Sequence, residues 1–168
     1  MKIKRVTVTP IAFRDPPLLN ASGIHEPFAL RSIIESTAIP IATGERAYSR
    51  WDFIPLFEAG IAVAQPDVSH AGGISETRRI AAQAETYGVS LAPHSPLGPI
   101  ALAASLQIDF ATPNFLIQEQ SRGIHYNTGW DVLDYLVDGS VFEIVDGSIA
   151  RPIVARLGIE VDEAAVRA

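Results

Sequence analysis

Residues 61–94 read IAVAQPDVSHAGGISETRRIAAQAETYGVSLAPH, and this stretch decides the fold. Two short apolar runs in it, Ile61–Gln65 and Val89–Ala92, are typical of strands buried on both faces. Between them, Gly72–Tyr87 carries apolar side chains at helical spacing opposite charged ones, which predicts an amphipathic helix, and Gly88 suits the position just after it. A strand, a covering helix and a second strand in this order predict a parallel sheet.

The same alternation continues on both sides of this stretch. Before it, Ile39–Ala42 is an apolar run bounded by Pro and Gly, and Trp51–Ala59 has the pattern of a short helix. After it, Ile100–Phe110 is apolar on nearly every side, which predicts a buried helix, and Phe115–Ile117 predicts a last strand. The central part of the chain is therefore expected to be an α/β fold built on a parallel sheet.

Four polar residues mark the ends of these strands: Glu45, Asp67, His94 and Glu119. They are separated by about 22, 27 and 25 residues, which is close to one strand and helix of a (β/α)₈ barrel. In such barrels the side chains that follow the strands converge on one mouth, so the four are expected to face one pocket. A full barrel needs about 250 residues. With 168 residues, this chain can form about half of one.

The composition narrows the functional class. The formal net charge of −6, without clusters of Lys or Arg, argues against a nucleic-acid surface. The chain has no cysteine and hence neither a disulfide framework nor a thiolate nucleophile, which is compatible with the reducing cytoplasm. Its first residues alternate apolar and polar side chains, and no run of about 18 apolar residues occurs, so we expect neither a signal peptide nor a membrane span.

The two ends of the chain carry weaker patterns. Ile3–Phe13 alternates apolar and polar residues, which predicts a half-buried strand, and Arg14–Pro27 is a loop rich in Pro, Gly and Asn. Phe28–Ile34 is expected to be a second strand that pairs back on the first as a hairpin. Further along, Trp130–Leu136 has the pattern of a short helix, and Val141–Ala150 predicts a hairpin around an Asp-Gly turn.

Four sequence blocks carry a resemblance to a known family. They are ATGER (residues 42–46), QPDVSHAGG (65–73), APHSPLGP (92–99) and IQEQSRGIHYN (117–127). From Ile39 to about Gly129 the chain resembles the acid-sugar dehydratases of the enolase superfamily, mandelate racemase subgroup, and among them the galactonate dehydratases. The first 35 residues, with TPIAFRDPPLLNASGIHEPFALRSII, instead resemble the start of a glucarate dehydratase.

The resemblance implies a partial TIM (β/α)₈ barrel that is enolase C-terminal domain-like, with a short β-hairpin before it. It divides the chain into a remnant of an amino-terminal capping domain (1–35), half of a barrel (36–129), and a carboxyl-terminal capping segment with a tail (130–168). About 200 residues of a full-length relative are expected to be absent between Glu35 and Ser36.

The resemblance also assigns chemical roles. In the family, carboxylates that follow successive strands hold Mg²⁺, and Glu45 matches the third of them. Asp67 and His94 match a pair in which the histidine is the general base that takes the C2 proton. Glu119 matches a carboxyl group that must be protonated to hydrogen-bond the enediolate oxygen. Magnesium is therefore the expected cofactor, and binding to this chain alone is expected to be weak.

Two further histidines, His25 and His125, lie in matching segments and are expected to bind substrate. The roles together imply a dehydratase that removes a proton beside a carboxylate, releases water and forms a 2-keto-3-deoxy acid. The expected partner is a small sugar acid, with neither nucleic acid nor membrane, and the chain is expected to form a homo-oligomer. The other interpretation is a catalytically inactive half-barrel whose exposed sheet edges make it self-associate.

Each role also has a structural alternative. Asp67 could cap a helix or close a turn, since it follows a proline. Glu119 could pair with Arg122 at the surface, which would contribute little. Simple loop or structural roles are the alternatives for the others, Glu45, His70, His94 and His125.

Overall fold

The computed structural model describes residues 6–7, 27–121 and 132–167. Its helices are α1 (Pro27–Ser36), α2 (Arg50–Ala59), α3 (Ile74–Thr86), α4 (Pro99–Asp109) and α5 (Glu163–Arg167). Its strands are β1 (Val6–Thr7), β2 (Ala42–Thr43), β3 (Val63–Ala64), β4 (Ser90–Leu91), β5 (Ile144–Val145) and β6 (Ser148–Ile149). Two 3₁₀ turns, η2 (Val132–Tyr135) and η3 (Gly139–Phe142), precede β5.

The strands β2, β3 and β4 form a parallel sheet in that order. Parallel bridges from Asp67 to His94 and from Leu91 to Phe115 extend it, so a further chain segment lies beside β4. The expected parallel α/β fold is therefore confirmed. The strands are shorter than the apolar runs, and β2 starts three residues after Ile39. Pro40, in between, has no N–H to donate to a neighbouring strand.

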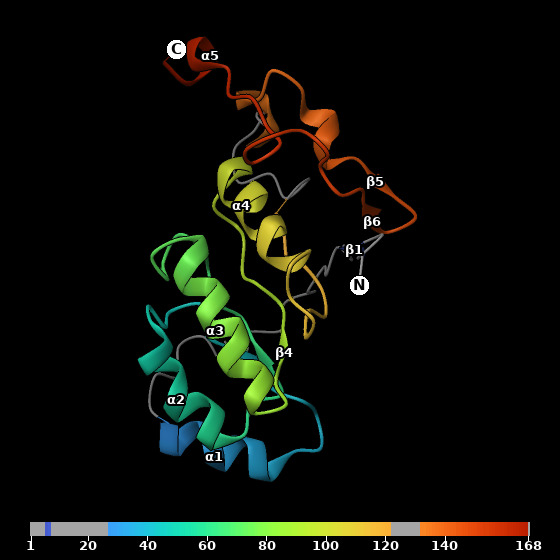
Figure 1. Ribbon diagram of the computed structural model, residues 1–168. Coiled ribbons are helices and arrows are strands. Elements are labelled where there is room, and N and C mark those ends of the chain that lie inside the picture. Colours follow the sequence, from blue (N-terminus) through green and yellow to red (C-terminus); the bar gives the residue numbers. More distant parts are fainter. Residues whose placement is uncertain (1–5, 8–26, 122–131, 168) are drawn as a thin grey trace.

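The helices α1 to α4 form the layer beside this sheet (Figure 1). They pack in a row, α1 on α2, α2 on α3 and α3 on α4 (Figure 1). The bounds of α2, α3 and α4 agree closely with the helices expected from the sequence. Each of β2, β3 and β4 is followed by one helix, which is the repeating unit of a (β/α)₈ barrel.

The core between the sheet and the helices holds the ends of the strands in place. Phe53 of α2, Ile80 of α3 and Leu91 of β4 are fully buried, and each such side chain stabilises the fold by about 1.5–3 kcal/mol. Phe53 packs against Gly44, where an added Cβ would lie 2.6 Å from a ring carbon and where φ is +133°. Glycine at this position therefore lets Phe53 pack directly beside the loop that carries Glu45.

A second core joins α4 to the carboxyl-terminal segment. Leu106 of α4 packs with Phe142, and both are almost completely buried. Strands β5 and β6 pair antiparallel, and positive φ angles at Asp146 (50°) and Gly147 (70°) allow the tight turn between them. The expected hairpin is thus confirmed. Of the helix expected over Trp130–Leu136, the structure describes the 3₁₀ turn η2, and residues 130 and 131 lie outside the described residues.

The expected second strand of an amino-terminal hairpin, Phe28–Ile34, is wrong. This segment lies in the helix α1. Leu30 and Ile34 are four residues apart, which places them on one helix face, and both pack into the core beside α2. Burial of this face against α2 stabilises the helix over an isolated hairpin, whose two strands would be marginally stable in water.

The strand β1 lies within the expected strand Ile3–Phe13, and among the described residues its partner is β6, with which it pairs antiparallel. The helix α1 runs across the boundary expected between Glu35 and Ser36. The division of the chain into 1–35, 36–129 and 130–168 stays a prediction. Within the described ranges, none of the helices has the length and apolar character needed to span a bilayer.

Candidate active site

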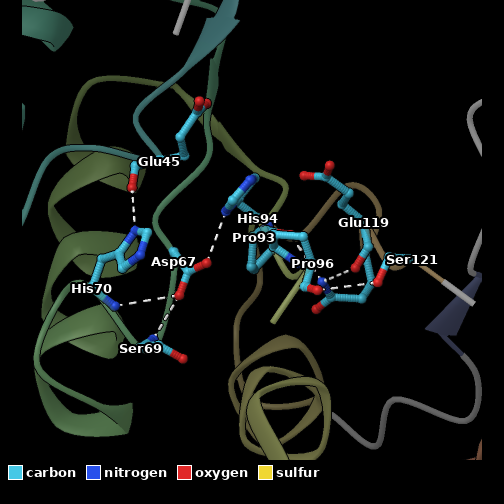
Figure 2. Close-up of polar contacts among 10 residues, drawn as sticks. Glu45, Asp67, Ser69, His70, Pro93, His94, Pro96, Glu119 and Ser121 are labelled. Atoms are coloured by element: carbon cyan, nitrogen blue, oxygen red, sulfur yellow. Dashed lines mark hydrogen bonds and ion pairs between the residues drawn. The ribbon is translucent and has the colours of Figure 1, made fainter. Parts of the chain in front are cut away.

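Polar side chains gather where the parallel strands end, as the spacing predicts. Glu45 follows β2, Asp67 follows β3 and His94 follows β4. Glu119 follows the segment that bridges to β4 at Phe115. Figure 2 shows the side chains of Glu45, His94 and Glu119 pointing to the same side of the structure, with Asp67 between the first two. Glu45, His94 and Glu119 therefore face one region, and Asp67 reaches it through its contact with His94 (Figure 2).

Asp67 and His94 form a hydrogen-bonded pair. The Nδ1 atom of His94 lies 2.8 Å from Oδ2 of Asp67, whose side chain is 0% exposed, against 18% for His94. The backbone holds the two residues together as well, because His94 N–H donates to the carbonyl of Pro66 at 3.2 Å. A carboxylate can accept but not donate, so Nδ1 carries the proton and Nε2 is the nitrogen that can take one.

The second carboxylate oxygen of Asp67 closes the turn that follows β3. Its Oδ1 accepts from the backbone N–H groups of Ser69 at 2.7 Å and His70 at 3.3 Å. The turn role that the sequence left open is therefore present together with the pairing to His94. Because different oxygens serve the two roles, the turn fixes the direction of the oxygen that faces His94.

The environment shifts the pKa values of this pair in opposite directions. Burial alone would lower the pKa of His94, but the hydrogen bond to Asp67 and the negative charges around the ring raise it above its usual value. Burial alone would raise the pKa of Asp67, but the hydrogen bonds from His94 and from the Ser69 N–H lower it. An ionised carboxylate beside an imidazole of raised pKa makes a proton acceptor suited to near-neutral pH.

Glu119 lies in a different environment. Burial raises the pKa of its carboxyl group, His94 counteracts this, and the charges of Glu45 and Asp67 raise it further. Gln118 fixes the neighbouring backbone, since its buried Nε2 donates to the carbonyl of Pro93 at 2.9 Å. The loops that carry His94 and Glu119 are thus tied together, and Glu119 is a carboxyl group that tends to keep its proton.

His70 also belongs to this group, although the sequence analysis left a simple loop role open for it. Its ring Nδ1 lies 2.9 Å from the carbonyl oxygen of Glu45, and its ring centroid lies 6.4 Å from that of His94. Its position three residues after Asp67, in the turn that follows β3, is the feature of the sequence that could have predicted its place in the site. His25, His125 and Arg122, named from the sequence, lie outside the described residues.

The described residues do not fit a magnesium site. Among them, no group of three His, Asp or Glu side chains is placed to hold a metal ion. Mg²⁺ prefers six oxygen ligands in octahedral geometry, and Glu45 supplies one carboxylate.

Comparison with known proteins gives consistent matches. A family model described as enolase C-terminal domain-like matches residues 19–165. D-galactonate dehydratases from Variovorax paradoxus (strain S110) and Xanthomonas axonopodis pv. citri (strain 306) are 50% and 51% identical over 152 residues, which is 90% of this chain and 39% of each relative. The chain therefore spans about two fifths of the length of these relatives. A match of this length also reaches into the segment before Ser36.

Solved structures agree with the sequence matches. A mandelate racemase/muconate lactonizing enzyme from Sulfitobacter sp. has a TM-score of 0.72 and 34% identity, covering 84% of this chain and 35% of that one. A mandelate racemase/muconate lactonizing enzyme-like protein from Roseovarius sp. TM1035 has a TM-score of 0.74 and 34% identity, with coverage of 84% and 34%. The resemblance of the first 35 residues to glucarate dehydratases stays a prediction.

Proposed function

Since this chain belongs to the enolase C-terminal domain-like family, we propose that Asp67, His94 and Glu119 are the proton-abstraction site of an acid-sugar dehydratase of the galactonate type. The substrate class is a small sugar acid. The reaction removes the C2 proton beside the carboxylate, expels the C3 hydroxyl as water and gives a 2-keto-3-deoxy acid. The observation that carries this proposal is the 2.8 Å contact between His94 Nδ1 and Asp67 Oδ2.

In this proposal, His94 is the general base. Its Nε2 accepts the C2 proton, and the positive charge that forms on the ring is stabilised by Asp67. Asp67 stays ionised during the transfer, because its pKa is lowered while the pKa of His94 is raised. The turn that holds the other oxygen of Asp67 keeps the pair oriented before substrate binds.

Glu119 stabilises the intermediate that forms when the C2 proton leaves. The enediolate carries negative charge on the oxygens of the former carboxylate, and a protonated carboxyl group can donate a hydrogen bond to one of them. Burial favours this protonated form of Glu119. None of the described residues is assigned to protonate the leaving hydroxyl, so the residues named here act in removal of the C2 proton and in stabilisation of the enediolate.

Magnesium enters the proposal only through the family. The resemblance assigns Glu45 as one of its ligands, and the described residues supply too few others. We expect any Mg²⁺ binding by this chain alone to be weak, since one carboxylate with water does not make a tight site.

A second candidate is a half-barrel without turnover that self-associates. It is favoured by the short span relative to the D-galactonate dehydratases, 39% of their length. Among the described residues, β2 pairs with β3 alone, and Ile39 just before it is 72% exposed, while Leu116 at the opposite edge is 56% exposed. Open strand edges with exposed apolar side chains favour association between copies. The homo-oligomer expected from the sequence is part of this proposal.

One assay separates the two candidates. Formation of a 2-keto-3-deoxy acid from galactonate and from glucarate is measured with Mg²⁺, using the parent chain and the His94→Ala variant. Product that disappears in the variant supports the dehydratase. No product from either protein, together with a dimer or larger species by light scattering, supports the half-barrel, whereas a monomer would contradict the argument from exposed edges.

A further inference from the structure

We propose that His70 is a positioning residue that ties the loop of Glu45 to the Asp67–His94 pair. Its two hydrogen bonds carry the proposal. The backbone N–H of His70 donates to Asp67 Oδ1 at 3.3 Å, and its ring Nδ1 lies 2.9 Å from the carbonyl oxygen of Glu45 (Figure 2). The residue thus connects the loop that follows β2 with the turn that follows β3.

The chemistry of the partner determines which nitrogen of His70 carries a proton. A backbone carbonyl accepts and cannot donate, so Nδ1 of His70 must be protonated for this contact. Nδ1 carries a proton in the cationic ring and in one of the two neutral tautomers. Both of these forms can donate the hydrogen bond to the Glu45 carbonyl.

The loop of Glu45 needs such a link. The preceding strand β2 has two residues and pairs with β3 alone among the described residues. Gly44, just before Glu45, has a φ of +133°, and the turn is closed by the hydrogen bond from Ala47 N–H to the Gly44 carbonyl at 3.0 Å. An edge strand leaves its following loop supported on one side. The ring of His70 supplies support from the next strand.

The ring itself is held in place by its neighbours. The Tyr48 ring meets it edge-on, with centroids 6.0 Å apart, and the His94 ring lies at 6.4 Å. Tyr48 belongs to the loop that His70 contacts, so the aromatic contact strengthens the same connection. A ring fixed by one hydrogen bond and two ring neighbours is a well-defined anchor.

The consequence for the site is electrostatic. The negative charge of Glu45 raises the pKa values of both His94 and Glu119. A loop that moves away would weaken this effect, because the interaction of two charges falls as their distance grows. His70 thereby keeps Glu45 where it acts on the groups proposed to move and hold protons. This inference rests on the proposed function for the roles of His94 and Glu119, and its test requires no turnover.

The test compares neutral replacements of His70 in the full chain. His70→Asn keeps an amide N–H near the position of Nδ1, whereas His70→Ala removes it. His70→Gln places its amide near Nε2 instead and serves as a second variant without the link. The titration of the His94 ring is followed by NMR in each protein. The same set is repeated with Glu45→Gln, which removes the charge whose position is in question.

We expect the pKa of His94 to be lower in the Ala and Gln variants than in the Asn variant. With Glu45→Gln, this difference should disappear, which a role of His70 in stability alone would not produce. Equal titration of His94 in the Asn, Ala and Gln variants would overturn the inference, and so would a difference that persists with Glu45→Gln. Where the parent chain forms product, we expect His70→Ala to lose about tenfold to a hundredfold in kcat and His70→Asn to keep most of it. Absent product with the expected titration would refute the proposed function and leave this inference standing.

Discussion

Replacing Asp67 by Asn probes the pair at the centre of the site. The side-chain oxygen of Asn can keep the two contacts of Oδ1, with the N–H groups of Ser69 (2.7 Å) and His70 (3.3 Å). The amide NH₂ then faces His94 Nδ1, where the carboxylate oxygen stood. In the opposite amide orientation, the NH₂ group would face the N–H donors of Ser69 and His70, and both of those hydrogen bonds would be lost to keep the one to His94. We therefore expect the ring of His94 to change tautomer, with Nε2 protonated and unable to accept a proton.

The structure gives the size of the effect. A hydrogen bond to a charged group stabilises a protein by about 1.5–3 kcal/mol. The Asp67 side chain is 0% exposed, so water screens this hydrogen bond little. Removing a buried charge, however, also removes part of the free-energy cost of burying it. We expect a net destabilisation of about 1–2 kcal/mol for Asp67→Asn. Asp67→Ala should cost about 1 kcal/mol more, because two backbone N–H groups lose their acceptor.

The sign of the pH dependence follows from the shifts. The pKa of Asp67 is lowered, so its contribution is present above the usual Asp value and is lost as pH falls through the folded pKa. The pKa of His94 is raised, so its contribution is present below the usual His value and is lost as pH rises through the folded pKa. The difference in unfolding free energy between parent and Asn variant should therefore be largest between these two limits.

The assay is a long-range ¹H–¹⁵N NMR spectrum of the histidine rings, combined with urea unfolding. The parent should show the Nδ1–H tautomer of His94, and the Asn variant the Nε2–H tautomer. In the Ser-His-Asp triad of serine proteases, replacing the Asp by Asn changes the tautomer of the His in the same way and costs about 10⁴ in kcat, and a comparable loss of C2-proton removal is expected here. A variant that keeps the Nδ1–H tautomer and the parental titration of His94 would refute the reasoning.

Three other substitutions test separate parts of the account. Gly44→Ala should destabilise the chain by about 2–4 kcal/mol in urea unfolding, because the new Cβ would lie 2.6 Å from a Phe53 ring carbon at a φ of +133°. The control Gly72→Ala, at a φ of +84° with nothing within 4 Å of the new Cβ, should cost about 1 kcal/mol. Equal losses of stability in the two variants would contradict this. Asp109→Asn should make the chain more stable than the parent at pH 7, because burial raises the pKa of this carboxyl well above its usual value. The parent therefore loses stability as pH rises above the usual Asp pKa, and the variant does not. Unfolding free energies of parent and variant that change with pH in parallel would rule this out. Glu119→Gln keeps a hydrogen-bond donor at every pH, so the fall in turnover that ionisation of Glu119 causes as pH rises should vanish in this variant. A fall of the same size in the parent and the variant would count against the role of Glu119.

Much of the barrel-like part could be predicted from the sequence. The spacing of apolar residues and the glycines beside them predict the helices α2, α3 and α4. The repeat length of one strand and one helix predicts which polar residues follow the strands. The convergence of Asp67 and His94 was predictable because adjacent parallel strands end side by side, and the structure places their side chains 2.8 Å apart.

Other features depend on contacts that no local pattern encodes. Phe28–Ile34 allows alternation as well as helical spacing, and its packing against α2 decides in favour of the helix α1. The pairing of β1 with β6 joins residues about 140 positions apart and leaves no mark in either segment. The link from His70 to Glu45 depends on the height of two loops above the sheet, which the sequence alone does not give.

The most direct test of the central claim follows the C2 proton itself. Galactonate is incubated with the chain in D₂O, and the ¹H NMR signal of C2–H is followed over time for the parent and for His94→Ala. The account predicts that the parent replaces this proton by deuterium and that the variant does not. Exchange at the same rate in both proteins, or no exchange by the parent above the buffer background, would contradict the assignment of His94 as the base.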